Sequence, residues 1–201
     1  QLFLVGYHLP VILTKSEEGW TAEWSNDSLI AKSEASVADD MEVFWVGTVS
    51  TSMAGTAEGG KMSAKDQEAI VTILTAMNCI PIFLESELAR RCFNGYCKSV
   101  LYPTMHNIDI LNIICAPWTL KSHGLDTAVA IWDQSQSESF GVLWQSYQEV
   151  NSIFARTLSE HCKGGDSVWI HNYQLCLVPR LISEQFTKLE MQRPKMVFFF
   201  H

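Results

Sequence analysis

The stretch from residue 140 to residue 200 reads FGVLWQSYQEVNSIFARTLSEHCKGGDSVWIHNYQLCLVPRLISEQFTKLEMQRPKMVFFF and twice passes from a helical pattern to an apolar run. Its first part predicts an amphipathic helix over 140–161, because large apolar residues recur at steps of three and four, namely Trp144, Tyr147, Val150, Phe154 and Leu158. Lys163-Gly164-Gly165 ends this helix with a cation and a glycine stop. The runs Val168–Ile170 and Met196–Phe200 then predict two strands, with a helix over Leu175–Thr187 between them.

The preceding residues continue the alternation. Three further strands are predicted at Leu2–Val5, Val43–Val46 and Cys79–Phe83, and a helix at Ala64–Met77. Most of these strands are apolar at consecutive positions, as expected when helices cover both faces of a parallel sheet. The chain is therefore predicted to be an α/β domain whose ligand crevice lies beyond the carboxyl ends of the strands. The stretches 50–61 and 135–138 are predicted to be surface loops.

The composition limits the classes of function. Of 201 residues, 47% are hydrophobic and 18% charged, and 14 Lys and Arg oppose 22 Asp and Glu for a net charge of −8. This balance argues against binding nucleic acid or anchoring to an anionic membrane. No apolar run approaches the roughly 18 residues that span a bilayer. The six cysteines form no CxxC pair, so we expect reduced thiols in a cytoplasmic protein, with no metal site and no cofactor.

Polar residues after the predicted strands are the first candidates for a site. His171 could be a ligand or an acid–base group, although a histidine at a strand end is more often structural. Asn172 is equally well explained as a turn former or helix cap. The stretch Tyr102–His106 suits a sugar-binding loop, with aromatic core packing as the alternative. No phosphate-binding glycine motif or paired carboxylates occur, so spacing alone leaves the function open.

Five blocks of sequence, in this order, resemble the trehalose-6-phosphate synthases, which are retaining glycosyltransferases of family 20. They are Val5–Val11, Cys79–Leu84, Phe93–His106, Leu143–Ala155 and Trp169–Leu175. The ending Phe198–His201 is similar to the start of a further family segment. The resemblance implies a Rossmann-like parallel sheet flanked by helices, the N-terminal, acceptor-side lobe of a GT-B glycosyltransferase, over residues 1–201. Similarity at Trp24–Leu29 and Gly95–Lys98 implies the class II, plant-type subgroup, in which a phosphatase domain usually follows.

Departures from the family pattern concentrate in the implied substrate pocket. The family carries arginine where His8 stands, and histidine cannot form the bidentate fork that grips a phosphate. The family's donor-side glycine pair aligns with Asp27 and Ser28, which adds bulk and a negative charge beside a nucleotide diphosphate. A tryptophan of the acceptor pocket is replaced by Thr48.

The remaining pocket positions continue this trend. The resemblance aligns the acceptor tyrosine with Phe93, the acceptor tryptophan with Tyr102 and the pocket aspartate with Asn172. His171 and His201, on the donor side, match the family. Each lost contact could cost about 1–3 kcal/mol, although losses within one site are not additive.

Two functions follow from the resemblance. One is a synthase-like domain of trehalose biosynthesis with a degenerate acceptor site, non-catalytic and active in regulation, assembly or sugar-phosphate sensing. The other is an active retaining glucosyltransferase that makes trehalose 6-phosphate from UDP-glucose and glucose 6-phosphate in the full-length protein. Expected partners are a C-terminal synthase-like lobe and a phosphatase domain or other trehalose-complex subunits, without nucleic acid or membrane. The 201-residue chain alone is predicted to be inactive, and to be aggregation-prone or to self-associate.

Overall fold

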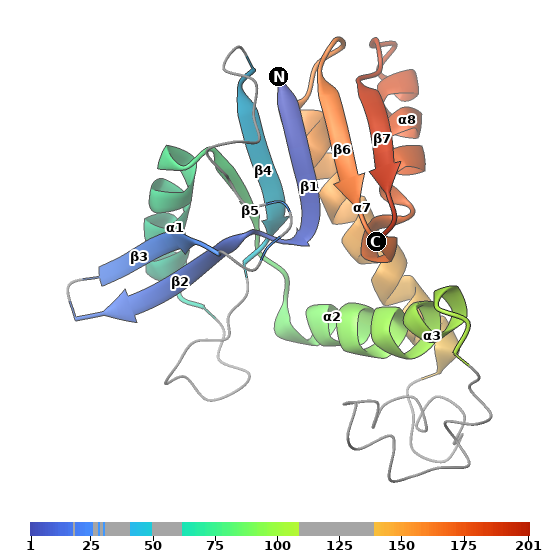
Figure 1. Cartoon of the computed structure of the whole chain (residues 1–201), viewed down its shortest axis with the longest axis horizontal. Coiled ribbons are helices and arrows are strands. Elements are labelled where there is room, and N and C mark those ends of the chain that lie inside the picture. The colour runs from blue at the N-terminus through green and yellow to red at the C-terminus, as the bar shows by residue number, and fades with distance from the viewer. Residues whose placement is uncertain (18, 26–27, 29, 31–40, 50–61, 109–138) are drawn as a thin grey trace, which may run out of the picture. The chain divides into compact units, whose positions relative to one another are not determined.

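The computed structural model describes residues 1–17, 19–25, 28, 30, 41–49, 62–108 and 139–201 (Figure 1). These residues form two compact units, one of 1–83 with 154–201 and one of 84–153. We call them the sheet unit and the helical unit. The predicted loops at 50–61 and 135–138 lie outside the described residues.

The sheet unit is built on five parallel strands in the order β5-β4-β1-β6-β7, with β1 at the centre (Figure 1). All five predicted strands are confirmed, with bounds that differ by one to three residues. They are β1 (Leu2–His8), β4 (Val43–Thr48), β5 (Cys79–Ile82), β6 (Ser167–His171) and β7 (Lys195–Phe199). Because the central strands are covered on both faces, consecutive residues such as Leu2 and Phe3 are both buried.

Helices provide this cover. α7 (Phe140–His161) has the predicted bounds, and its last three turns bury Phe154 and Leu158. The ring of Phe154 stacks on that of Tyr7 in β1, with centroids 6.2 Å apart. α8 (Val178–Lys188) buries Val178, Ile182 and Phe186, and begins three residues later than predicted, because a 3₁₀ turn occupies Tyr173–Leu175.

The antiparallel hairpin of β2 (Val11–Ser16) and β3 (Gly19–Trp24) is not predicted by the sequence analysis. Alternate side chains of the hairpin, including Leu13 and Trp24, pack against a buried cluster that contains Ile70 of helix α1 (Ala64–Ala76). The hairpin thus buries one face by docking on α1 and the sheet edge, which explains its alternation of apolar and polar residues.

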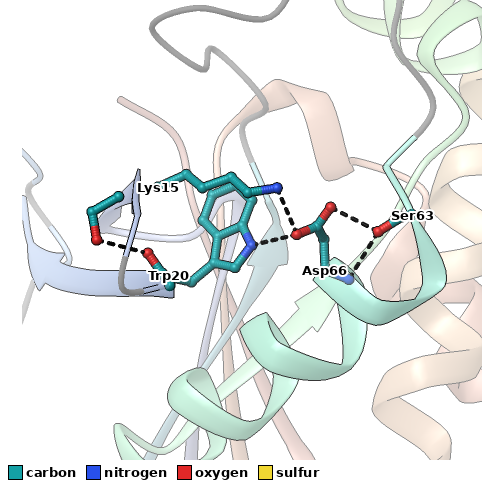
Figure 2. A network of polar contacts seen from close by, with 6 residues as sticks. Lys15, Trp20, Ser63 and Asp66 are labelled. Atoms are coloured by element: carbon teal, nitrogen blue, oxygen red, sulfur yellow. Dashed lines mark hydrogen bonds and ion pairs between the residues drawn. The ribbon is translucent and has the colours of Figure 1, made fainter.

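A polar network, which we call the Asp66 network, ties the hairpin to α1 (Figure 2). Lys15 Nζ and Trp20 Nε1 each donate to Asp66 Oδ1 at 2.8 Å. Ser63 caps α1 by accepting from the Asp66 N–H at 3.1 Å, and its hydroxyl donates to Asp66 Oδ2 at 2.7 Å. These donors hold the pKa of Asp66 well below its usual range, with Lys15 as the largest cause. The carboxylate therefore stays ionised and binds the hairpin through two donors.

The helical unit contains a nearly continuous helical run over 86–105, which the sequence analysis did not predict. It comprises α2 (Ser86–Arg90), a π-helical segment (Arg91–Leu101) and α3 (Tyr102–Met105). The interpretation of Tyr102–His106 as a loop is wrong, because Tyr102–Met105 are helical and Pro103 occupies the first turn of α3, where its missing N–H is tolerated. Gly95 leaves room for Leu143, since a Cβ at that position would lie 2.6 Å from Leu143 Cδ2.

Strand β7 forms one edge of the sheet and exposes apolar side chains, with Val197 at 43% and Phe198 at 38%. Trp169, which pairs with Val197 across β6 and β7, is 38% exposed. These residues are the structural basis for the expected self-association, which stays a prediction. Within the described ranges, no helix combines the length and the apolar character needed to cross a membrane.

Candidate functional site

Polar residues gather at the carboxyl ends of the parallel strands of the sheet unit, where ligands bind in folds of this class. His8 ends β1, Thr48 ends β4, and His171 ends β6. Asn172 follows β6 directly, and His201 lies two residues beyond β7. The structure therefore brings five of the predicted site residues to one edge of one sheet.

His8 and Thr48 form a hydrogen-bonded pair. The Thr48 hydroxyl donates to the carbonyl oxygen of Tyr7 and lies 2.9 Å from Nδ1 of His8. Because a hydroxyl has one proton to donate, Thr48 can only accept from His8, so Nδ1 of His8 carries its proton. In a neutral ring, Nε2 of His8 is then an acceptor, which suits a sugar hydroxyl and opposes a phosphate oxygen.

Gly47 permits the close approach of β4 to the end of β1. A Cβ at Gly47 would lie 2.6 Å from the Leu9 nitrogen and 2.8 Å from the His8 carbonyl carbon, and both are backbone atoms that cannot move aside. This close contact fixes the backbone that presents His8, so the His8–Thr48 pair is a rigid feature of the sheet.

His171 and His201 form a second pair, with His171 Nδ1 3.1 Å from His201 Nε2. The rings are parallel within 5° and their centroids are 5.4 Å apart, which exceeds the N–N distance by roughly one ring width. The two nitrogens therefore point at each other along a straight hydrogen bond and do not converge on a common metal position. Phe199 stacks on the His171 ring at 4.9 Å.

Burial lowers the pKa of His171 to about 4, and the neighbouring His201 acts in the same direction. His171 is thus neutral at pH 7. Its Nε2 is buried and has no hydrogen-bond partner in the part of the chain that the structure describes. A neutral imidazole adds no positive charge to this edge of the sheet.

Asn172 has a strained backbone, with φ 76° and ψ 163°, a region that is almost confined to glycine. Its N–H donates to the Phe199 carbonyl at 2.7 Å, and its Oδ1 accepts from the Tyr173 N–H at 3.0 Å. The second bond confirms the cap interpretation of Asn172. Strain of this kind costs about 1–3 kcal/mol and clusters at functional sites.

The other predicted positions lie elsewhere. Ser28 is half-buried, and its hydroxyl accepts from the Ile30 N–H at 3.4 Å, while Asp27 lies outside the described residues. Phe93 and Tyr102 belong to the helical unit, where Phe93 is half-buried and Tyr102 is 38% exposed.

The described residues contain no cluster of three or more His, Cys, Asp or Glu side chains that could hold a metal ion. Burial raises the pKa of both Cys79 and Cys162 to about 12, so neither thiol is a nucleophile at neutral pH. The sequence analysis did not single out Lys98, whose ammonium group lies over the Phe93 ring in the helical unit. No short-range signal could have predicted this contact, because it depends on the π-helical turns of Arg91–Leu101.

Comparison with known proteins identifies the relatives of this chain. Residues 129–201 match glycosyltransferase family 20. The chain is 27% identical over 192 residues to the α,α-trehalose-phosphate synthase [UDP-forming] 1 of Arabidopsis thaliana, covering 95% of this chain and 17% of that protein. It is 28% identical over 203 residues to synthase 5 of the same organism, covering all of this chain and 20% of the relative. The chain thus spans about a fifth of the length of these relatives.

The fold is also shared with a solved structure. The N-terminal domain of a Candida albicans trehalose-6-phosphate phosphatase has a TM-score of 0.58 at 19% identity, covering 100% of this chain and 33% of that one. The predicted fold, a Rossmann-like parallel sheet of the kind found in GT-B glycosyltransferases, is confirmed. The predicted resemblance to the trehalose-6-phosphate synthases is confirmed as well.

Proposed function

We propose that this trehalose-6-phosphate synthase-like chain is an acceptor-side lobe whose site no longer supports glucosyl transfer. It acts in regulation, assembly or sugar-phosphate sensing within trehalose metabolism. The observation that carries the proposal is the His8–Thr48 pair, in which the Thr48 hydroxyl, itself a donor to Tyr7, accepts from Nδ1 of His8.

The pair explains why His8 cannot replace the arginine that the family resemblance implies at this position. An arginine presents a permanent charge and two parallel donors to a phosphate. His8 uses one nitrogen on Thr48, so at most one nitrogen faces a ligand, and that nitrogen is an acceptor when the ring is neutral. The acceptor phosphate therefore loses its bidentate contact.

The neighbouring strand end also supports the proposal, because the resemblance implies that Asn172 replaces a charged residue. The Oδ1 atom of Asn172 accepts a hydrogen bond from the Tyr173 N–H. An aspartate at this position would add a negative charge that accepts hydrogen bonds from sugar hydroxyls. His171 and His201 are hydrogen-bonded to each other. The Candida albicans neighbour supports the non-catalytic proposal, because a domain of this fold there belongs to a phosphatase.

The alternative is an active retaining glucosyltransferase in the full-length protein. Retention of His171 and His201, together with the strained backbone of Asn172, favours it. In that reaction the bond between the glucosyl carbon and the UDP oxygen breaks on the same face on which the acceptor hydroxyl bonds. The hydroxyl proton passes to the leaving phosphate, and the protein stabilises the developing charges.

Further proposals concern the surroundings of the lobe. A C-terminal synthase-like lobe would supply the cations for the diphosphate of UDP-glucose. A phosphatase domain or other subunits of a trehalose complex would be its partners, and the cytoplasm its compartment. These proposals follow from the resemblance to proteins about five times as long as this chain.

The deciding experiment is a paired assay of the full-length protein for UDP release, with UDP-glucose and glucose 6-phosphate, and for phosphate release from trehalose 6-phosphate. We expect no acceptor-dependent UDP release. His8→Ala is expected to leave the binding of glucose 6-phosphate, measured by calorimetry, unchanged. Acceptor-dependent UDP release, or micromolar binding that His8→Ala abolishes, would overturn the proposal.

A further inference from the structure

The helical run over 86–105, together with His106 that caps its end, carries a stripe of aromatic and basic side chains on its exposed side. We call it the Lys98 stripe, and its members are Phe93, Lys98, Tyr102 and His106. Lys98, Tyr102 and His106 are exposed and Phe93 is half-buried. The opposite side of the π-helical segment is buried and contains Cys92, Gly95, Tyr96, Cys97 and Ser99.

The stripe exists because the helix is wide. Lys98 Nζ lies 5.0 Å from the centroid of the Phe93 ring, five residues earlier. In a regular α-helix a five-residue step advances about 1.4 turns, which would place Lys98 on another side. In π-helical turns residues five apart are adjacent, as the Ser99 hydroxyl confirms by donating to the Asn94 carbonyl at 2.9 Å. Such turns are frequent at functional sites.

Within the described residues, no carboxylate neutralises the ammonium group of Lys98. In the turns just before it, Arg90 and Arg91 both pair with Glu87, at 2.8 and 3.2 Å. Lys98 forms no ion pair within the ranges that the structure describes, and its ammonium group lies over the face of the Phe93 ring. The aromatic ring holds the ammonium in place without cancelling its charge.

The residues one and two turns further along the stripe complete an amphipathic surface. Tyr102 and His106 stack with centroids 4.1 Å apart, and His106 Nδ1 lies 2.9 Å from the Tyr102 carbonyl oxygen. The stripe thus combines a positive charge, an aromatic ring face and polar ring atoms. This combination suits a ligand with one anionic group and one compact polar ring.

We propose that Lys98 binds the phosphate group of a phosphorylated sugar whose ring contacts Tyr102. The inference rests on the proposed function, because it places a sugar phosphate at two positions of the implied acceptor site. It adds Lys98 as the residue that binds the anion and makes sugar-phosphate sensing the role of the lobe. His8 is then dispensable for binding.

The test is calorimetry of the full-length protein with glucose 6-phosphate, with glucose and inorganic phosphate as probes of the two halves of the ligand. Removing one charge-assisted contact predicts that Lys98→Gln weakens glucose 6-phosphate binding roughly tenfold. Lys98→Arg keeps the charge and is expected to stay within about threefold of the wild type. Lys188→Gln, which removes an exposed lysine from the last turn of α8, is the matched control and is expected to change nothing.

Each outcome either supports or overturns the assignment of Lys98 as the phosphate-binding residue. Equal affinity in the wild type and Lys98→Gln, equal loss in Lys188→Gln, or equal affinity for glucose and glucose 6-phosphate overturns the assignment. So does an undetectable affinity of the wild type, which leaves the non-catalytic function standing. Conversely, acceptor-dependent UDP release with a KM for glucose 6-phosphate that rises in Lys98→Gln would overturn the non-catalytic function and support the role of Lys98. Thermal unfolding of each variant shows whether it is folded.

Discussion

Two lysines of this chain lie over aromatic rings, and their surroundings differ in one respect. Lys15 lies 5.3 Å from the Trp20 centroid and Lys98 lies 5.0 Å from the Phe93 centroid, so the cation–π geometry is nearly the same. Lys15 also pairs with the Asp66 carboxylate at 2.8 Å, whereas Lys98 forms no ion pair within the described ranges.

This difference distinguishes a lysine that stabilises the fold from a lysine whose charge is available to bind a ligand. In the Asp66 network the charge of Lys15 is used inside the protein, to hold a hairpin against a helix (Figure 2). In the Lys98 stripe an aromatic ring positions the charge but leaves it for an external anion. Changes at the first place should therefore affect stability, and changes at the second should affect binding.

The largest expected effect on stability is that of Asp66→Ala. This change removes the acceptor of Lys15, Trp20 and the Ser63 hydroxyl, whereas the cap itself, a bond from the backbone N–H of residue 66 to Ser63 Oγ, remains. We expect a lower melting temperature and faster amide hydrogen exchange in β2 and β3 than in the five-stranded sheet. The loss of three hydrogen bonds is expected to lower the melting temperature by roughly 4–8 °C in a chain of this length. Unchanged protection of the hairpin would show that apolar packing alone holds it.

A pH titration of stability should resolve two windows. Since the pKa of His171 falls from 6.5 to about 4 on folding, the unfolded chain binds the extra proton first. The free energy of unfolding is therefore expected to decrease as the pH falls from about 6.5 to about 4. Asp66, whose folded pKa is held below its ordinary 3.8, adds a further loss below about pH 4.

Matched variants assign each window, with urea unfolding as the measurement. His171→Phe should flatten the upper window and keep the stacking on Phe199, and Asp66→Asn should flatten the lower one. If His171→Phe leaves the slope between pH 6.5 and pH 4 unchanged, then His171 is not the group that titrates there.

The smallest expected effects on stability are those of Lys15→Gln and Lys98→Gln. Their melting temperatures compare the two lysines directly. Lys15 is 46% exposed, so solvent screens its ion pair with Asp66, and we expect Lys15→Gln to lower the melting temperature by no more than about 4 °C. Lys98→Gln should stay within about 0.5 kcal/mol of the wild type, as surface changes do. Differential scanning fluorimetry measures both, and an equal loss in the two variants would contradict the distinction.

The strands of the sheet and the helix over 140–161 were predictable, because burial on both faces requires consecutive apolar residues and burial on one helical face requires steps of three and four. The hairpin was not predicted although its strands alternate apolar and polar residues, because each strand is only six residues long and its apolar side chains are half-buried or, at Ile12, exposed. The site was predictable only in part. His171 and Asn172 could be placed at a strand end from sequence, but the His171–His201 hydrogen bond joins side chains 30 residues apart.

The linear order of apolar and polar residues by itself determined the parallel α/β architecture, the carboxyl edge that bears His8, Thr48 and His171, and the kinship with trehalose-phosphate synthases. These features depend on periodicities of two to four residues and on short blocks, which are local. Only the tertiary structure decided that the Thr48 hydroxyl accepts a hydrogen bond from Nδ1 of His8. The same is true of the position of Lys98 over the Phe93 ring. Hydrogen-bond partners and π-helical turns depend on packing between distant segments, and no local pattern encodes them.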